Sequence, residues 1–508
     1  MRRGAALAMV GAAVSLPVLL HMGGGLQAAD APPARSPARP PTRVGINLFG
    51  AQWHNRQQVF ANMIAQSEWM ESRGAGWKAF PPGQLDAMGW VQRLEPGQVA
   101  PRLLALPSAP YRKVAVRCTF RGGGELGAGG IAQVSGRGRQ DVRLTLNPTG
   151  AEGEMGWIEL RRTDPRDPLR DIDCRTDGTP VAARFDPEFV QSLSGFAVLR
   201  FMDWQRTNDN ARIAWDRRTL PQSSSQVAAA GVAVEDMVDL ANAVHADPWF
   251  TMPYHADGAY LHGFARLVHD RLDPDLKVHV ELGNEVWNTM FAAARDAGQE
   301  GLARSLGDGD PHRARMERYA QRMTDAMRVW TQVYADRPGA LVRVCATQNA
   351  NPDLARTVLG FRDTARWVDA LATAPYVGTD LAGYGPGDVD RVFAAMPGAL
   401  AETFEKAAEN RAVAATYGKR YIAYEGGQHL VTPDLALARA VQRDPRMGAI
   451  YDRYLTQWRS RFGDTMVLYA STAPISQWGA WGLSEHGGQP LAQAPKLRAV
   501  RNFLETTR

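Results

Sequence analysis

The sequence predicts an α/β protein built on a (β/α)8 TIM barrel, with a small antiparallel β-sandwich domain inserted near its start. Two observations lead to this prediction. From about residue 185 onward, short apolar runs alternate with amphipathic segments of helical length, which is typical of a parallel sheet covered by helices. Between about 95 and 180, alternating apolar and polar residues punctuated by glycine are instead typical of antiparallel strands.

Eight apolar runs are long enough to form barrel strands, and eight is the number that a TIM barrel needs. They lie at 44–48, 196–201, 249–253, 278–282, 342–347, 368–374, 421–424 and 466–470. Amphipathic segments between them predict helices at 234–245, 259–271, 313–336, 400–417 and 447–462. Runs at 113–117, 141–146 and 157–160 predict strands of the inserted domain, which therefore separates the first two barrel strands.

The N-terminus has the pattern of a signal peptide, which we expect to span residues 1–31. Arg2 and Arg3 precede an apolar stretch that is broken by Pro17 and is shorter than the ~20 residues that cross a bilayer. A Pro- and Ala-rich linker follows at 32–42. The barrel then takes 43–94 and 181–508, and the inserted domain takes 95–180. We expect a secreted or periplasmic protein with no transmembrane segment after cleavage.

Composition excludes several classes of protein. Hydrophobic residues make up 45% of the 508-residue chain, which is enough for a large core. The net charge of +5 is spread without a stripe of basic and aromatic residues, so nucleic acid is not expected as a partner. A mild attraction to acidic polysaccharides is compatible with this charge. The oligomeric state cannot be inferred from the sequence.

We expect neither a metal nor a cofactor. No phosphate-binding or dinucleotide fingerprint and no G-x-S-x-G motif occurs in a suitable context. The histidines do not share metal-ligand spacing, as His54, His245, His262 and His429 illustrate. Cys118, Cys174 and Cys345 form no C-x-x-C pair. In an oxidising compartment Cys118 and Cys174 could form a disulfide, or both could remain buried thiols.

Two glutamates stand at strand ends, where TIM barrels build their active sites. Glu285 follows the fourth predicted strand and Glu425 follows the seventh. Hydrolysis of a glycosidic bond needs one protonated carboxyl group to donate to the leaving oxygen and one ionised carboxylate to attack the anomeric carbon. These two residues are therefore the candidate catalytic pair.

The motifs around this pair resemble a known group of enzymes. Asn-Glu at 284–285 ending the fourth strand, with a lone Glu425 ending the seventh, resembles the large clan of retaining glycoside hydrolases with (β/α)8 barrels. The runs at 199–204 and 284–288 also look like a group of secreted bacterial and fungal proteins often labelled cellulose-binding, which carries a similar β insertion. The resemblance implies a retaining hydrolase of β-glycosidic bonds in a polysaccharide, most plausibly a cell-wall or exopolysaccharide glucan.

The resemblance also implies a role for individual residues. Glu285 would be the general acid and then base, and Glu425 the nucleophile, kept ionised by Arg200 and Tyr376. Asn284 would bond the sugar 2-hydroxyl. Further residues follow the strand ends and are candidates for binding substrate, although several have an alternative structural role: Asp203, Trp204, His255, Trp287, Trp478 and Trp481.

The alternatives for these residues are specific. Asp203 either bonds sugar hydroxyls or pairs with Arg200. His255 is either part of the site or a structural histidine. Each of the tryptophans at 204, 287 and 481 either stacks on sugar or packs in the core, and Trp478 is expected to form the floor of the sugar site. Glu281, on the same strand as the acid, is expected to be a buried supporting residue.

A second functional class is a non-catalytic carbohydrate-binding protein that keeps the barrel. Such a protein would dock on a matrix polysaccharide through its tryptophans and its inserted domain. A barrel that has lost catalysis usually lacks one carboxylate or the asparagine, and here Asn284, Glu285 and Glu425 are all present. The sequence therefore favours the enzyme.

Overall fold

A computed structural model describes residues 42–506, apart from 75, 107–112, 150–152 and 209–211. The predicted signal peptide and all but the last residue of the predicted linker lie outside the described residues. Secretion therefore stays a prediction. Within the described residues, no helix is both long and apolar enough to cross a bilayer.

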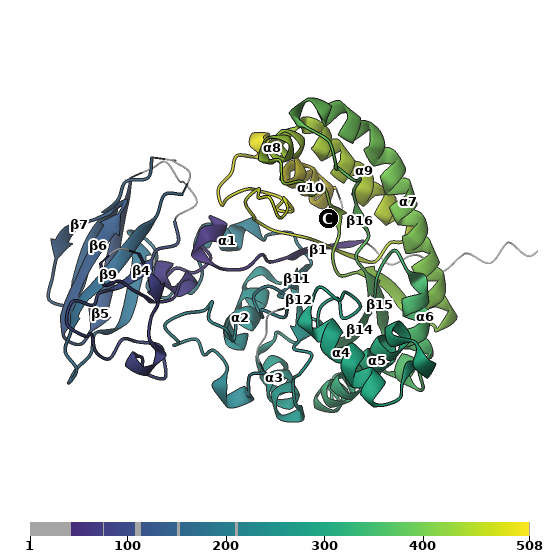
Figure 1. Ribbon diagram of the computed structural model, residues 1–508, viewed down its shortest axis with the longest axis horizontal. Helices are drawn as coiled ribbons and strands as arrows, with labels where there is room; N and C mark the ends of the chain where they lie inside the picture. The colour runs from purple at the N-terminus through teal and green to yellow at the C-terminus, as the bar shows by residue number, and fades with distance from the viewer. Residues whose placement is uncertain (1–41, 75, 107–112, 150–152, 209–211, 507–508) are drawn as a thin grey trace, which may run out of the picture. The chain divides into compact units, whose positions relative to one another are not determined.

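Eight parallel strands close into a barrel, and helices surround it (Figure 1), which confirms the predicted fold class. The last strand pairs with the first in parallel, so the barrel has no open edge. In barrel order the strands are β1 (Arg43–Asn47), β11 (Val198–Arg200), β12 (Asp247–Met252), β13 (Val278–Leu282), β14 (Leu341–Ala346), β15 (Ala370–Thr373), β17 (Arg420–Ala423) and β19 (Thr465–Leu468).

The helices begin where short polar side chains can cap them. Asp257 accepts from the backbone N–H of Tyr260 at the start of α3, and Asp310 accepts from that of His312 at the start of α5. The helices are α1 (Pro187–Ser192), α2 (Val234–Val244), α3 (Gly258–Arg271), α4 (Ala292–Ala303), α5 (Pro311–Val333), α6 (Pro352–Gly360), α7 (Val389–Thr416), α8 (Leu435–Arg443), α9 (Pro445–Arg461) and α10 (Pro495–Glu505).

Two of these helices differ from expectation. Helix α4, which is not among the predicted helices, lies in the stretch that follows the fourth barrel strand. Helix α7 begins eleven residues before the expected 400 and continues through Pro397. Burial explains this start, because Val392, Phe393 and Met396 pack into the core upstream of the proline. That packing offsets the backbone hydrogen bond that proline cannot make.

The chain between β1 and β11 forms two antiparallel sheets that share a second core. One has the order β10-β5-β8-β7 and the other β4-β9-β6. Their strands are β4 (Ala100–Leu103), β5 (Val114–Arg121), β6 (Gly124–Gly130), β7 (Ala132–Arg137), β8 (Asp141–Leu146), β9 (Gly156–Thr163) and β10 (Arg170–Thr176). Burial alternates residue by residue along β5, as expected when one face of a sheet packs inward and the other meets water.

Residues before the inserted sheets also contribute to their core. Met63, Ile64, Trp69 and Trp90 pack into it, although the predicted boundary of the inserted domain is at 95. The short hairpin of β2 (Met70–Glu71) and β3 (Lys78–Ala79) lies in this segment. The core of the inserted sheets therefore draws on residues upstream of that boundary.

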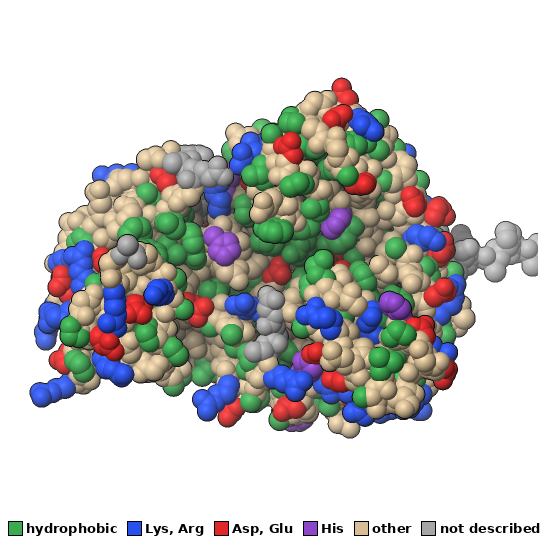
Figure 2. All heavy atoms as spheres, viewed as in Figure 1, with side chains coloured by type: hydrophobic (Ala, Val, Ile, Leu, Met, Phe, Trp, Pro, Cys, Tyr) green, Lys and Arg blue, Asp and Glu red, His purple; other side chains and the backbone are tan. Residues whose placement is uncertain are grey.

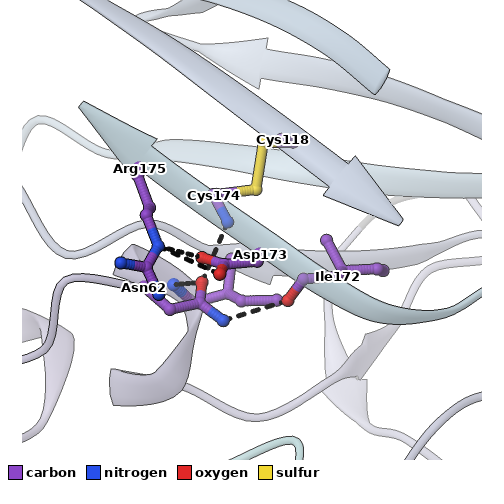
Figure 3. The surroundings of a disulfide bond; sticks show 7 residues. Asn62, Cys118, Ile172, Asp173, Cys174 and Arg175 are labelled. Carbon is purple, nitrogen blue, oxygen red and sulfur yellow. Dashed lines mark hydrogen bonds and ion pairs between the residues drawn. A yellow bond between two sulfur atoms is a disulfide. The ribbon is translucent and has the colours of Figure 1, made fainter. Parts of the chain in front are cut away.

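Cys118 and Cys174 form a disulfide, which decides between the two alternatives left open by the sequence (Figure 3). The two cysteines are directly opposite each other on β5 and β10. Asn62 holds β10 from the other side, because its Nδ2 donates to the carbonyl of Ile172 at 2.9 Å and its Oδ1 accepts from the N–H of Cys174 at 3.0 Å. Cys345 is a free, buried thiol in the barrel.

Candidate active site

Arg200, the last residue of β11, is fully buried at the centre of the site. Its guanidinium donates to Oε1 of Glu425 at 2.7 Å and to Oε2 of Glu281 at 3.0 Å. It also donates to the side-chain oxygens of Asn47 and Asn284, each at 2.9 Å. Burial alone would lower the pKa of Arg200, but the charges of Glu281 and Glu425 outweigh burial and raise it. Arg200 therefore stays charged and orients carbonyl and carboxylate oxygens from three other strand ends.

Glu425 follows β17 by two residues and is 5% exposed. Its second oxygen, Oε2, accepts a hydrogen bond from the hydroxyl of Tyr376 at 2.9 Å. The backbone explains this contact, because β16 (Tyr376–Val377) and β18 (Gly427–Gln428) pair in parallel just beyond the barrel rim. Gly427 has φ +117°, a conformation that favours glycine, so the chain can turn immediately after Glu425. One ion pair and one hydrogen bond thus hold the carboxylate in place.

Glu285 lies three residues past β13 in a tight turn. Gly283 has φ +69°, and Glu285 itself has φ +45°, a left-handed conformation that is uncommon for a residue with a side chain. Such strain concentrates at functional positions. The carboxyl group accepts from Nδ2 of Asn288 at 2.9 Å and from the hydroxyl of Tyr424 at 3.3 Å.

The protonation of Glu285 differs from that of an ordinary carboxyl group. Burial, and then the negative charge of Glu425, raise its pKa to about 7. The hydrogen bonds from Asn288 and Tyr424 act in the opposite direction but are outweighed. Near neutral pH a substantial fraction of Glu285 is therefore protonated, while the neighbouring Glu425 forms an ion pair with Arg200. Acid-assisted nucleophilic displacement requires two carboxyl groups in different environments, and these two differ in their partners and burial.

Asn284 and Glu281 also lie within this cluster. The Oδ1 of Asn284 faces Arg200, and its Nδ2 donates to Oδ1 of Asn208 at 3.1 Å. An amide nitrogen carries two hydrogens, so one remains for a further acceptor. Glu281 is fully buried and accepts from Nε1 of Trp249 at 2.9 Å as well as from Arg200. Its place beneath the site fits the expected supporting role.

A pocket of about 540 Å³ opens beside this cluster at the ends of β1, β11 and β19. Asp203 and Trp481 line it, together with Tyr469, whose hydroxyl donates to Asp203 at 3.2 Å. Arg200 has other partners, so the alternative in which Asp203 pairs with Arg200 is not what the structure shows. Asp203 instead faces the pocket.

The tryptophans are distributed differently from expectation. Trp204 is 2% exposed and packs against Phe60, Phe189 and Phe201, so its ring has no face for a sugar. Trp478 is 76% exposed on a turn closed by Ser476 and does not line the 540 Å³ pocket; Trp481 does. Trp478 lies at the tip of a turn between Ser476 and Gly479, whereas Trp481 follows that turn, and sequence position alone could not distinguish them.

Two further candidates, His255 and Trp287, follow β12 and β13. Trp287 is half-buried and lines a second pocket, of about 360 Å³, together with Asn288. His255 pairs with Asp296 through Nε2 at 2.7 Å and packs against the ring of Tyr254. His255 lines neither of these two pockets, and its contacts match the structural alternative.

Sequence reasoning missed several residues of the site. Asn47 ends β1 as Arg200 ends β11, and a systematic reading of every strand end could have found it. Tyr424 directly precedes Glu425, and this position next to a candidate catalytic residue could have indicated it. Asn208 and Tyr469 come from loops, where no periodicity marks a side chain that points into a pocket.

Three side chains in the described residues could share a metal ion: His245, Asp273 and Asp275. They precede β12 and β13, whereas Glu285 and Glu425 follow their strands, so this group lies at the opposite end of the barrel. It takes no part in the candidate active site.

Comparison with known proteins shows distant similarity to glycoside hydrolases that have an eight-stranded barrel. No protein-family model matches the chain, and no curated protein matches its sequence. Similar solved structures include an α-L-arabinofuranosidase from Thermotoga maritima, with 12% identity over 60% of this chain and 61% of that chain, at a TM-score of 0.37. A 4-O-α-L-rhamnosyl-β-D-glucuronidase from Fusarium oxysporum has 13% identity over 61% and 62%, at a TM-score of 0.36.

An endo-1,4-β-D-mannanase from Thermotoga petrophila has 11% identity over 62% of this chain and 92% of that chain, at a TM-score of 0.35. The present chain spans about three-fifths of the length of the first two structures. Similarity this distant concerns the fold alone, so function must be inferred from the site itself.

Proposed function

We propose that this protein is a secreted retaining glycoside hydrolase that cleaves β-glycosidic bonds in a polysaccharide. The observation that carries the proposal is the pairing of Glu425, which Arg200 contacts at 2.7 Å and Tyr376 at 2.9 Å, with Glu285, whose pKa is raised to about 7. The two residues come from strand ends at opposite sides of one barrel rim. Their different environments divide the roles of nucleophile and acid between them.

In the first step, an oxygen of Glu425 would attack the anomeric carbon while the bond from that carbon to the leaving oxygen breaks. Glu285 would give its proton to the leaving oxygen, so that the departing sugar leaves as a neutral alcohol. Asn284 would direct its remaining amide hydrogen to the hydroxyl next to the reacting carbon. Arg200 keeps Glu425 oriented, because it is anchored on Glu281 and Asn47 at the same time.

In the second step, Glu285, now ionised, would take a proton from water. The water oxygen would attack the anomeric carbon and break the ester bond to Glu425, which restores both carboxyl groups to their starting states. Two displacements at one carbon leave its configuration unchanged. The reaction uses no group beyond the side chains described and water.

The test is a screen of the purified protein against β-glucans, mannans, galactans and bacterial exopolysaccharides, with new reducing ends as the readout. On any polymer that is cleaved, Glu285→Gln and Glu425→Gln should each lower the rate by about a thousandfold, in the range expected for loss of a catalytic acid or nucleophile. Glu402→Gln, a change at an exposed position on α7, is the matched control and should leave the rate unchanged. Unaltered rates in both active-site variants would contradict the proposal.

A further inference from the structure

Two pockets flank the candidate catalytic pair. The β13 pocket, of about 360 Å³, contains Asn288, whose side chain donates directly to Glu285 at 2.9 Å. The β11 pocket, of about 540 Å³, contains Asn208, which accepts from Asn284 at 3.1 Å. If Glu285 protonates the leaving oxygen, the departing sugar must lie on the side of Glu285. The β13 pocket is then the leaving-group side, an assignment that rests on the proposed function.

The two pockets differ in charge. The β11 pocket contains both Asp203 and Arg206 and so carries opposite charges. The β13 pocket contains Arg315 and His312, and no acidic residue is among those that line it. The neighbouring carboxylate of Asp310 is occupied as the N-cap of α5, where it accepts from the backbone N–H of His312. The positive charge of Arg315 therefore has no carboxylate beside it among the residues that line this pocket.

In the described residues, two arginines of α5 pair with no carboxylate: Arg322, which donates to the backbone carbonyls of Tyr254 and Ala256, and Arg315, which lines the β13 pocket. On α5, Arg313 pairs with Glu317 and Arg318 pairs with Glu300, each at 2.7–2.8 Å. Arg315 forms no ion pair with a carboxylate in the part of the chain that the structure describes. Its Nη1 donates to the carbonyl of Trp287 at 3.0 Å, and its Nε is buried without a hydrogen-bond partner. Burial also lowers the pKa of Arg315, and the negative charge of Asp310 opposes this only in part.

The surroundings of Arg315 favour an anion further. The first turns of α5 and α6 both reach the β13 pocket, through His312 and Asn351, and helix N-termini carry partial positive charge. By contrast, blue and red side chains are interspersed over the visible face of the molecule (Figure 2). That face therefore offers an acidic polymer no broad basic surface, and the local site around Arg315 is the feature that would attract it.

We infer that the substrate is an anionic polysaccharide, and that the β13 pocket binds the carboxylate of an acidic sugar unit on the leaving-group side through Arg315. A guanidinium that is fixed by one backbone carbonyl and has further N–H groups to offer is suited to a planar carboxylate. The β11 pocket, with Asp203 and Tyr469, is suited to sugar hydroxyls. The two pockets would therefore bind different parts of the polymer: the acidic unit in the β13 pocket and neutral hydroxyl groups in the β11 pocket.

The experiment compares binding of acidic polysaccharides with binding of the same polymers after their carboxyl groups have been reduced to alcohols. Glucuronoxylan, hyaluronan and alginate are the probes, and affinity gel electrophoresis gives the dissociation constants. The Glu285→Gln variant is used throughout so that the polymers stay intact. At least one acidic polymer should bind more tightly than its reduced form, and Arg315→Gln should weaken that binding about tenfold, as loss of one charge-assisted hydrogen bond would.

Arg304→Gln is the matched control, because it removes the same charge from an exposed position outside both pockets and should leave binding unchanged. Equal binding of acidic and reduced polymers, or binding insensitive to Arg315→Gln, would overturn the inference. Cleavage of neutral glycans that depends on both glutamates would then leave the proposed function standing. Binding that depends on carboxylates and on Arg315, without cleavage by the unaltered protein, would sustain the inference and contradict the proposed function.

Discussion

Two fully buried arginines, Arg200 in the barrel and Arg102 in the inserted sheets, show how surroundings decide what one side chain does. Arg200 contacts two carboxylates, and its pKa is raised. Arg102, on β4, donates to the backbone carbonyls of Ile64, Ser67 and Ser224 and to no carboxylate. Burial lowers the pKa of Arg102 to about 9.

Aromatic rings complete the surroundings of Arg102. Its guanidinium carbon lies 5.1 Å from the ring centroid of Trp69 and 5.9 Å from that of Trp90, within the range of cation–π attraction. Ser224 belongs to the long segment that follows β11, so Arg102 joins the core of the inserted sheets to a loop of the barrel. Carbonyls and ring faces can hold a charge in place, whereas carboxylates also compensate it. Arg102 is therefore an architectural residue, and Arg200 serves the candidate chemistry.

The largest expected effect is that of Arg200→Met. The substitution leaves Glu281 and Glu425 buried without their cation, so we expect the rate of hydrolysis to fall at least about a thousandfold and the free energy of unfolding to fall by about 3–5 kcal/mol. Rates on the polymer found by screening, together with denaturant unfolding, measure the two effects. Activity within tenfold of the unaltered protein would break the contrast between the two arginines.

Arg102→Met should have a smaller and different effect. It leaves the carbonyls of Ser67 and Ser224 without their side-chain donor and removes one of the donors to Ile64, so we expect a loss of about 2–3 kcal/mol in the free energy of unfolding. The rate per folded molecule should stay near that of the unaltered protein, because Arg102 touches no residue of the site. The rate is measured at a temperature where the variant is folded. A fall as large as that of Arg200→Met would show that the contact between Arg102 and the loop after β11 serves catalysis.

The pH dependence of the rate follows from Glu285. A general acid must be protonated, and the pKa of Glu285 is raised to about 7, so the rate should fall as the pH rises through about 7. Removing the charge of Glu425 by Glu425→Gln should lower the pKa of Glu285, which ¹³C NMR titration of the carboxyl group can follow. A rate that already falls near the ordinary pKa of a carboxyl group would contradict the assigned pairing. A pKa of Glu285 that Glu425→Gln leaves unchanged would contradict it as well.

The same comparison shows how far sequence alone reaches. Barrel strands are apolar and regularly spaced, so their ends, and with them Glu285, Glu425, Arg200 and Tyr376, could be placed in advance. Asn47 and Tyr424 become visible only when the strands are brought side by side. Trp204 is buried and Trp481 lines a pocket, and this difference depends on the conformation of the loops that carry them. Arg102 carried no sequence cue, because its partners are backbone carbonyls that any residue provides.

The stereochemistry of the product tests the central claim most directly. If Glu425 attacks the anomeric carbon and water then displaces it, the first reducing ends released must have the anomeric configuration of the bond that was cleaved. Proton NMR of an early time point, before mutarotation, reports this configuration. Retention is the predicted result. An inverted product would contradict the account, because inversion needs water rather than Glu425 as the attacking group and a carboxyl pair about 6.5–9.5 Å apart.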